Sequence, residues 1–247
     1  MNKLILSFAA LSAFGLSAAP ALADAITLDA SSIGTNYTLT YNGFSSGTPI
    51  SGLTGSTTFK LTGISGNNYT FDYSVANTSS APITGSRISS FAFNADPNIT
   101  SAASTGAFSY TTLNSNYPNG IGTVDVCFKD ALTGSCAGGG SGGLTIGQSG
   151  TGSFTLSFSQ PISALTLSDF YVRYQSISGA GGITSASGAG TLSSTSSTSG
   201  GTTTSSGGTS VPEPGMLGLM SAGLIATALL RRRRHPARLA AVRPTYS

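Results

Sequence analysis

YTFDYSV, the stretch from Tyr69 to Val75, alternates large apolar side chains with small or polar ones. A period of two places the apolar side chains on one face of a β-strand and the polar side chains on the other. Further segments with this alternation are residues 37–41, 59–61, 88–93, 124–128, 154–158, 165–167 and 170–174. Short strands of this kind, without any amphipathic helical pattern, predict an all-β fold. We expect an antiparallel β-sandwich of jelly-roll or immunoglobulin-like type over residues 24–178.

The segments between these strands are rich in turn-forming residues. Gly66, Asn67 and Asn68 precede the Tyr69 strand, and since Gly and Asn tolerate positive φ angles they predict a hairpin turn. The longest segment without clear alternation, residues 94–120, predicts surface loops with one short strand near Phe108–Tyr110.

The composition, rich in Gly and poor in charge, also favours strands over helices. The distribution of the charges argues against nucleic acid as a partner. Charged residues make up 8% of the chain, which contains 33 Gly and no Trp. Seven of the eleven basic residues lie near the two ends, and the segment from Asp24 to Pro214 has four basic and eight acidic residues. A basic surface stripe is therefore missing outside the tail, and nucleic acid is not expected as a partner.

The first 23 residues have the organisation of a secretory signal peptide. Lys3 precedes an apolar stretch from Leu4 to Leu16, and Ala21-Leu-Ala23 is an A-x-A cleavage site. Signal peptidase is expected to cut between Ala23 and Asp24. The domain that follows is therefore expected to be exported, and its two cysteines to reach an oxidising compartment.

Near the other end, an apolar run predicts a transmembrane helix. Gly215–Leu230 contains 16 uncharged residues, which as a helix would measure about 24 Å against a hydrocarbon core of about 30 Å. Four basic residues follow directly: Arg231, Arg232, Arg233 and Arg234. Arginine is costly to place at mid-bilayer, so this cluster predicts a stop-transfer signal, with residues 235–247 as a cytoplasmic tail.

The residues in front of this helix add a resemblance. Val211-Pro212-Glu213-Pro214, the apolar run and the arginine cluster resemble the PEP-CTERM sorting signal of Gram-negative bacteria that make exopolysaccharide. The resemblance implies that residues 211–234 are recognised by an exosortase, with Pro212, Glu213 and Pro214 as the processing motif. It further implies passage through the inner membrane, transient anchoring by the helix, and delivery to the cell surface or the extracellular space. An ordinary membrane anchor is the alternative.

Residues 179–210 consist almost entirely of Gly, Ser, Thr and Ala. Such a segment buries little apolar surface to offset the entropy lost on ordering. It is therefore expected to be a flexible stalk between the sandwich and the sorting signal.

The two cysteines, Cys127 and Cys136, are expected to form one disulfide that closes a local loop. A metal pair is disfavoured because the exported segment has no histidine. The glycine-rich run at residues 137–143 predicts a flexible turn rather than a phosphate loop, since neither a helix nor a lysine follows it. Residues 126–144 and 167–177 also resemble the cistern family of PEP-CTERM proteins, and the resemblance extends from roughly the first strands to Ile177. It implies no particular activity.

The sequence predicts no enzyme and no cofactor. The single histidine, His235, lies in the expected cytoplasmic tail, which argues against Ser/His/Asp and Cys/His catalysis. The remaining candidates for acid–base chemistry are the carboxylates Asp96, Asp125, Asp130 and Asp169. The Asp and Asn side chains of the 94–98 loop are a candidate calcium site. Each is more simply read as a turn residue or an ion-pair partner, such as Asp169 with Arg173.

Three functions remain compatible with these residues. The first is a structural or adhesive surface protein associated with exopolysaccharide in a biofilm. The second is a carbohydrate-binding module that uses exposed tyrosines as stacking platforms. The candidate platforms are Tyr110, Tyr117, Tyr171 and Tyr174. The third is a glycosidase with two catalytic carboxylates.

Overall fold

The computed structural model describes residues 24–132, 136 and 142–197. The alternating segments form strands as expected, and every strand pairing is antiparallel. The strands are β1 (Ile26–Leu28), β2 (Thr35–Ser45), β3 (Thr48–Ser65), β4 (Asn68–Asn77), β5 (Gly85–Asp96), β6 (Ser101–Ser104), β7 (Tyr110–Tyr117), β8 (Gly122–Lys129), β9 (Leu144–Thr145), β10 (Ser149–Ser157), β11 (Leu165–Ser178) and β12 (Ser185–Ser197). Two single-turn 3-10 helices are η1 (Ala30–Ser32) and η2 (Gly106–Phe108).

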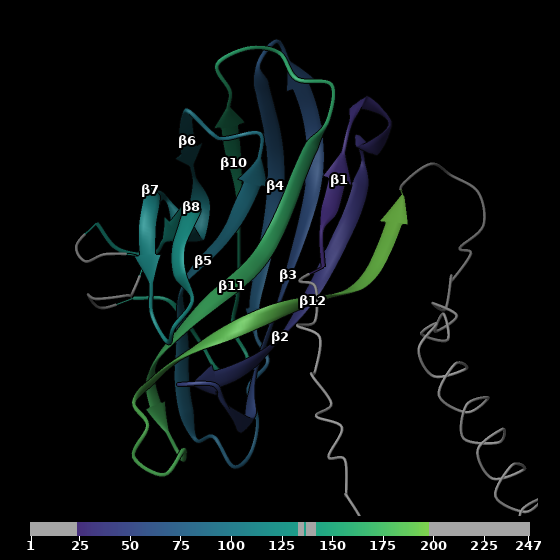
Figure 1. The fold of residues 1–247 in the computed structure, drawn as a ribbon. Helices are drawn as coiled ribbons and strands as arrows, with labels where there is room; N and C mark the ends of the chain where they lie inside the picture. Colours follow the sequence, from purple (N-terminus) through teal and green to yellow (C-terminus); the bar gives the residue numbers. More distant parts are fainter. Residues whose placement is uncertain (1–23, 133–135, 137–141, 198–247) are drawn as a thin grey trace, which may run out of the picture. The chain divides into compact units, whose positions relative to one another are not determined.

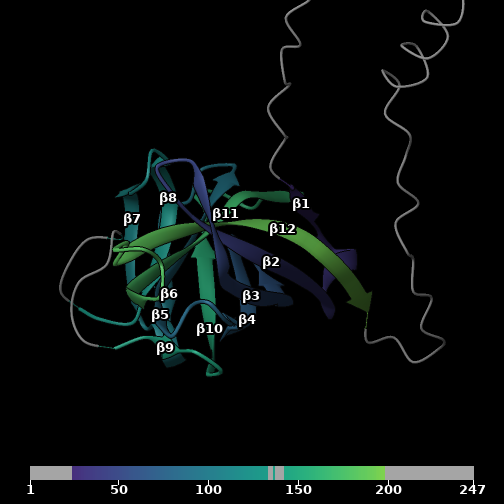
Figure 2. The same ribbon diagram turned by 90° about the horizontal axis from the view of Figure 1, so that it is seen from below.

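The prediction of an all-β antiparallel fold is confirmed, in the form of one continuous sheet that curls over itself. Its strand order is β6-β10-β4-β3-β2-β12-β11-β5-β8-β7, and β1 and β9 pair at its margins. In Figure 1, β11 and β5 lie in front of β10, β4 and β3, so the two halves of the sheet form the layers of a sandwich. Figure 2 shows β2 and β12 side by side where the sheet passes from one layer to the other.

Aromatic side chains fill the space between the layers. Phe59 on β3 lies against Phe91 on β5 and Phe170 on β11, with ring centroids 5.7 and 5.9 Å apart. Phe154 on β10 stacks on Phe71 and Phe128, each at 4.8 Å. All of these rings are at most 2% exposed. Offset and edge-to-face contacts at such distances add to the free energy gained from burying the rings.

The prediction of loops for residues 94–120 is wrong for much of this segment. It contains the end of β5, then β6, η2 and the whole of β7. The β6 residues are Ser and Ala, and in β7 only Leu113 lies between the two terminal tyrosines as a large apolar side chain. Alternation is faint in such segments, and pairing with β10 and β8 determines their conformation instead.

The predicted stalk is also wrong where it overlaps β12. Residues 185–197 form a strand hydrogen-bonded to β11 on one side and to β2 on the other. Their small side chains fit because aromatic rings already occupy the space. A Cβ added at Gly188 would lie 2.9 Å from the Tyr174 ring and 3.2 Å from Tyr41 Cβ. Residues 198–210 of the predicted stalk, the transmembrane helix and the signal peptide lie outside the described residues.

Within the described part of the chain, no helix has both the length and the apolar character needed to span a bilayer.

Candidate functional site

The predicted disulfide is present. Cys127 on β8 is bonded to Cys136, with Cα atoms 6.1 Å apart, and both residues are fully buried. The backbone of Cys136 is held on two sides: its carbonyl accepts from Ser90 Oγ at 3.2 Å, and its amide donates to Ser115 Oγ at 3.4 Å. The disulfide therefore fastens Cys136 to β8, and the two hydrogen bonds fasten it to β5 and β7.

A second, smaller core covers this disulfide. Tyr117, at the end of β7, packs against Tyr171 on β11 with ring centroids 5.7 Å apart, and Val124 joins the same cluster. The turn after β7 continues over the sheet, where the Asn119 amide lies 2.9 Å from Ser187 Oγ on β12. The end of the β7–β8 hairpin is thus folded onto the outer face of the sheet.

This arrangement corrects the prediction of four tyrosine platforms. Tyr117 and Tyr174 are 1% and 0% exposed, so neither ring can stack on a sugar. Tyr171 is half-buried beside Tyr117, whereas Tyr110 is 38% exposed at the start of β7. Tyr174 belongs to the main core, whereas Tyr117 belongs to the smaller core under its own hairpin. Alternation showed which residues belong to strands, but not that this hairpin covers part of the outer face.

Two of the candidate carboxylates are connected through one amide. Asn94 donates from Nδ2 to Asp169 Oδ2 at 3.0 Å and accepts through Oδ1 from the Asp125 amide, also at 3.0 Å. Asp125 Oδ2 accepts from the Ala95 amide at 2.8 Å. The Asp169 carboxylate therefore contacts Asn94, whereas Arg173 Nη1 lies 3.0 Å from the Asn119 amide, which can turn its oxygen toward the guanidinium. These contacts join β5 to β8 and to β11 beside the register shift of β11.

Beside Asp125 there is a polar cavity of about 350 Å³, lined by Asn98, Ile99, Asn114 and Asp125. This cavity includes Asn98 from the 94–98 loop, for which the sequence left a calcium site open. Among the described residues, however, no three His, Cys, Asp or Glu side chains gather as a metal-binding group.

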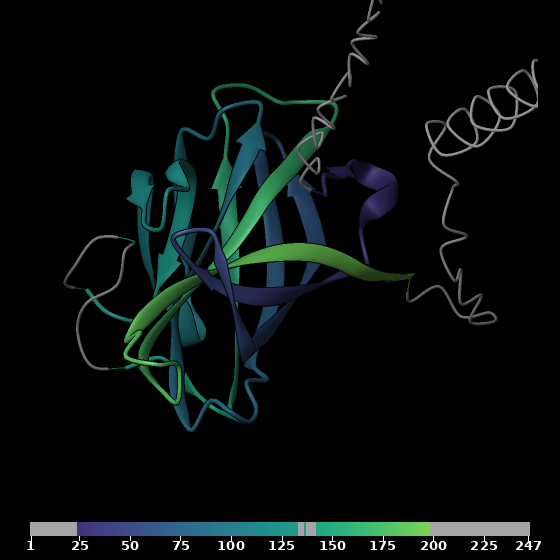
Figure 3. The same ribbon diagram turned by 60° about the horizontal axis from the view of Figure 1, so that its bottom comes forward.

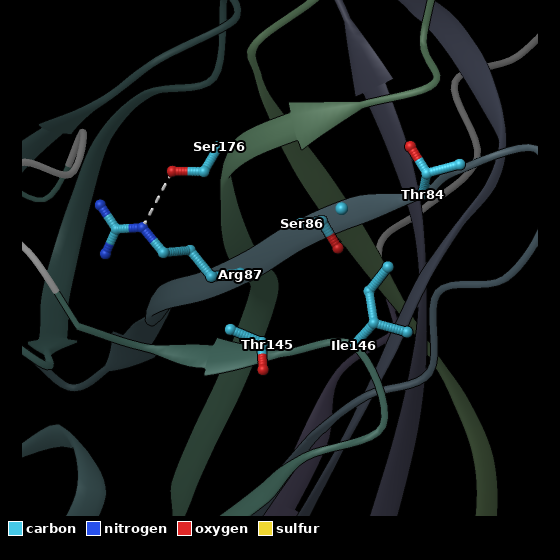
Figure 4. A pocket seen from close by; sticks show the side chains of 7 residues that line it. Thr84, Ser86, Arg87, Thr145, Ile146 and Ser176 are labelled. Carbon is cyan, nitrogen blue, oxygen red and sulfur yellow. Dashed lines mark hydrogen bonds between the residues drawn. The ribbon is translucent and has the colours of Figure 1, made fainter.

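Arg87 is the functional candidate that the sequence did not indicate. It lines a second cavity, of about 330 Å³, together with Thr84, Ser86, Thr145, Ile146 and Ser176 (Figure 4). Its Nε donates to Ser176 Oγ at 3.3 Å, and Nη2 donates to Gln175 Oε1 at 2.8 Å. A single arginine between Ser86 and Ile88 in a strand gave no motif to recognise.

Asp130 pairs with this arginine from within the disulfide loop. Its Oδ2 lies 3.6 Å from Arg87 Nη1, and the aspartate side chain is 6% exposed. Burial raises the pKa of the Asp130 carboxyl above its usual value of 3.8, and the nearby Arg87 charge only partly opposes that shift. Asp130 Oδ2 also accepts no hydrogen bond from the described residues.

We expect the free energy of unfolding to show the cost of ionising Asp130. Its pKa is higher in the folded than in the unfolded chain, so the folded state holds more protons just above pH 3.8, and this contribution to stability falls as the pH rises. Asp130→Asn should remove that slope, which for one proton is at most about 1.4 kcal/mol per pH unit. Urea unfolding of both proteins from about pH 3 to about pH 7 measures the difference. Parallel stability curves for the two proteins would contradict this prediction.

The residues expected to direct export lie mostly outside the described part of the chain: Ala23, Pro212, Glu213, Pro214, Arg231, Arg232, Arg233 and Arg234. Asp24, expected on the other side of the cleavage site from Ala23, is described, and its carboxylate accepts a hydrogen bond from the Leu192 amide on β12. A residue next to the predicted signal cleavage site is thus bound to the last strand of the sandwich.

Comparison with protein families tests the C-terminal motif directly. Residues 210–234 match the family model described as the PEP-CTERM protein-sorting motif. The chain carries a PEP-CTERM sorting motif. The match covers the proline triplet, the apolar run and the arginine cluster, so the PEP-CTERM assignment made from these residues is confirmed. The motif implies export, processing by an exosortase and sorting to the cell surface.

No curated protein matches the chain. No solved structure matches it either. The PEP-CTERM match spans only residues 210–234, so the resemblance of residues 126–144 and 167–177 to the cistern family stays a prediction.

Proposed function

We propose that this PEP-CTERM protein is cut at its sorting motif and remains at the cell surface as a structural or adhesive component of an exopolysaccharide matrix. The observation that carries the proposal is the motif match at residues 210–234, which follow the sandwich in the sequence. The buried Cys127–Cys136 disulfide supports it, because such bonds persist in oxidising compartments outside the cytoplasm. Signal peptidase would act first, followed by the exosortase, and the body of the protein would have no catalytic role.

The alternative of a carbohydrate-binding module based on aromatic stacking has less support. Two of its four tyrosines are buried, which leaves Tyr110 and the half-buried Tyr171. Stacking platforms present an open ring face to the sugar, and in this set only Tyr110 is substantially exposed.

The proposal predicts that the proline triplet controls maturation. Replacing Pro212, Glu213 and Pro214 together by alanine should leave the membrane helix attached, because the protease loses the extended stretch that it recognises. Cell fractionation should then show full-length protein in the membrane, and mass spectrometry should find no processed C-terminus.

Pro236→Ala is a suitable control, because it removes a proline that follows the arginine cluster while the triplet stays intact. The control should mature as the wild type does. The sorting step would be refuted by an identical mature C-terminus in the triplet variant. The matrix role would be refuted if deleting the gene left matrix yield and cell adhesion unchanged while the protein itself was found only in the medium.

A further inference from the structure

The outer face of five neighbouring strands carries hydroxyl groups in register. Ser194 on β12 lies opposite Thr38 on β2, and Thr38 lies opposite Thr58 on β3. The row continues to Ser74 on β4 and Thr151 on β10. We call these five residues the hydroxyl row. None of them is buried, and Figures 1 and 3 show their strands β2, β3, β4 and β10 side by side.

The rows on either side have the same character. In one of them Lys60 on β3 lies opposite Asp72 on β4, so the two charges sum to zero. The other row runs from β12 to β10, and Ala76 is its single apolar residue. Its members are Thr191, Thr40, Ser56, Ala76 and Ser149. The other positions in both rows are Ser, Thr or Asn. We call the three rows together the hydroxyl face.

This composition restricts what the face can bind. Solvated protein surfaces usually carry about 25–35% charged residues of both signs, whereas this face has one lysine opposite one aspartate. Its lack of net charge gives no attraction to a polyanion, and its lack of large apolar side chains gives no hydrophobic anchor. Hydroxyl groups both donate and accept hydrogen bonds, so the complementary partner is itself uncharged and rich in hydroxyls.

The hydroxyls are also ordered in advance. Thr38 Oγ1 and Thr58 Oγ1 lie 2.9 Å apart in the hydroxyl row. Just beyond the face on β4 and β10, Thr70 and Thr155 make a similar pair at 3.3 Å. β-branched side chains have few rotamers, so these groups lose little entropy when a ligand binds. Strands about 4.8 Å apart repeat the groups across the sheet, which suits an extended chain with many similar hydroxyls.

We propose that the hydroxyl face binds a neutral polysaccharide laid across the strands, by hydrogen bonds rather than by aromatic stacking. This inference rests on the proposed matrix function and names the surface that would make the contact. The face belongs to a different part of the sheet from the cavities beside Asp125 and Arg87.

The test compares binding of the exported mature protein to insoluble cellulose and cross-linked dextran, two neutral glucans, with binding to alginate, a polyanion. The main variant is Thr38→Val/Thr58→Val/Ser74→Ala, which removes three hydroxyls and keeps the shape of both threonines. At about 0.5–1.5 kcal/mol for each hydrogen bond, the affinity of the variant for a neutral glucan should fall at least about tenfold. Alginate should bind neither protein.

The matched control is Thr27→Val/Thr166→Val, which removes a hydroxyl pair 3.3 Å apart on β1 and β11, outside the hydroxyl face. It should bind as the wild type does. Ser74→Lys is a second variant, which places a charge in the hydroxyl row without changing the threonines. It too should weaken binding, and thermal unfolding should show that each variant is folded.

The inference is overturned if the wild type binds neither neutral glucan, if it prefers alginate, or if the triple variant and Ser74→Lys both bind as the wild type does. Each of these results leaves processing at the proline triplet and surface retention unchanged. Failure of the proposed function would appear instead as loss of those two cellular readouts.

Discussion

A domain truncated before Ser185 is expected not to fold. Residues 24–197 should unfold cooperatively on heating, whereas residues 24–184 should be insoluble or show no cooperative transition by circular dichroism. The physical reason is that β12 lies between β11 and β2. Its loss would separate the two halves of the sheet and expose Tyr41 and Tyr174, whose rings are at most 1% exposed. A soluble, cooperatively folded 24–184 domain would contradict the topology.

A point variant tests the same contact without removing the strand. In Gly188→Ala the new methyl group would lie 2.9 Å from Tyr174 and 3.0 Å from Val172 Cγ2, so the packing around it must shift. Crowding of this kind costs about 1–3 kcal/mol. Gly63→Ala on β3 is the control, because its added Cβ meets no atom within 4 Å. The two variants should differ in urea midpoint, with Gly188→Ala clearly less stable.

The difference between β4 and β12 shows how much of the fold the sequence could predict. Tyr69–Val75 forms a strand because its own alternation separates two faces, and that information is local. Residues 185–197 have almost no large side chains, so alone they resemble a linker. They form a strand because Tyr41, Phe170 and Tyr174 leave room only for a backbone with small side chains. None of these rings lies within the segment itself: Phe170 and Tyr174 are on the preceding strand β11, and Tyr41 is on the distant β2.

The candidate sites divide in the same way. A protease reads the sorting motif as a short linear stretch, so residues 210–234 could be identified without any structure. The disulfide was predictable because only two cysteines exist and they lie nine residues apart. By contrast, the contact of Asn94 with Asp125 and Asp169 joins three strands. Neither that contact nor the covering of Tyr117 by its own hairpin follows from local pattern.

Removing the disulfide is expected to have the largest effect of any change in the hairpin region. Cys127→Ala/Cys136→Ala should lower the free energy of unfolding by about 2.5–3 kcal/mol, from the chain entropy of a loop closed over nine residues. Loss of two fully buried sulfur atoms beside Tyr117 adds to this cost. Urea unfolding of the oxidised wild type and the double variant gives the difference directly.

Reduction of the wild type provides the control, since it opens the same loop while keeping both side chains. The free energy of unfolding of the reduced wild type should fall most of the way to that of the double variant. The difference that remains between them measures the packing lost with the sulfur atoms. Hydrogen exchange should rise first at the Cys136 amide, because we expect it to donate to Ser115 Oγ only while the disulfide holds Cys136 in place. Equal urea midpoints for the oxidised wild type and the double variant would mean that the second core alone holds the hairpin against β5.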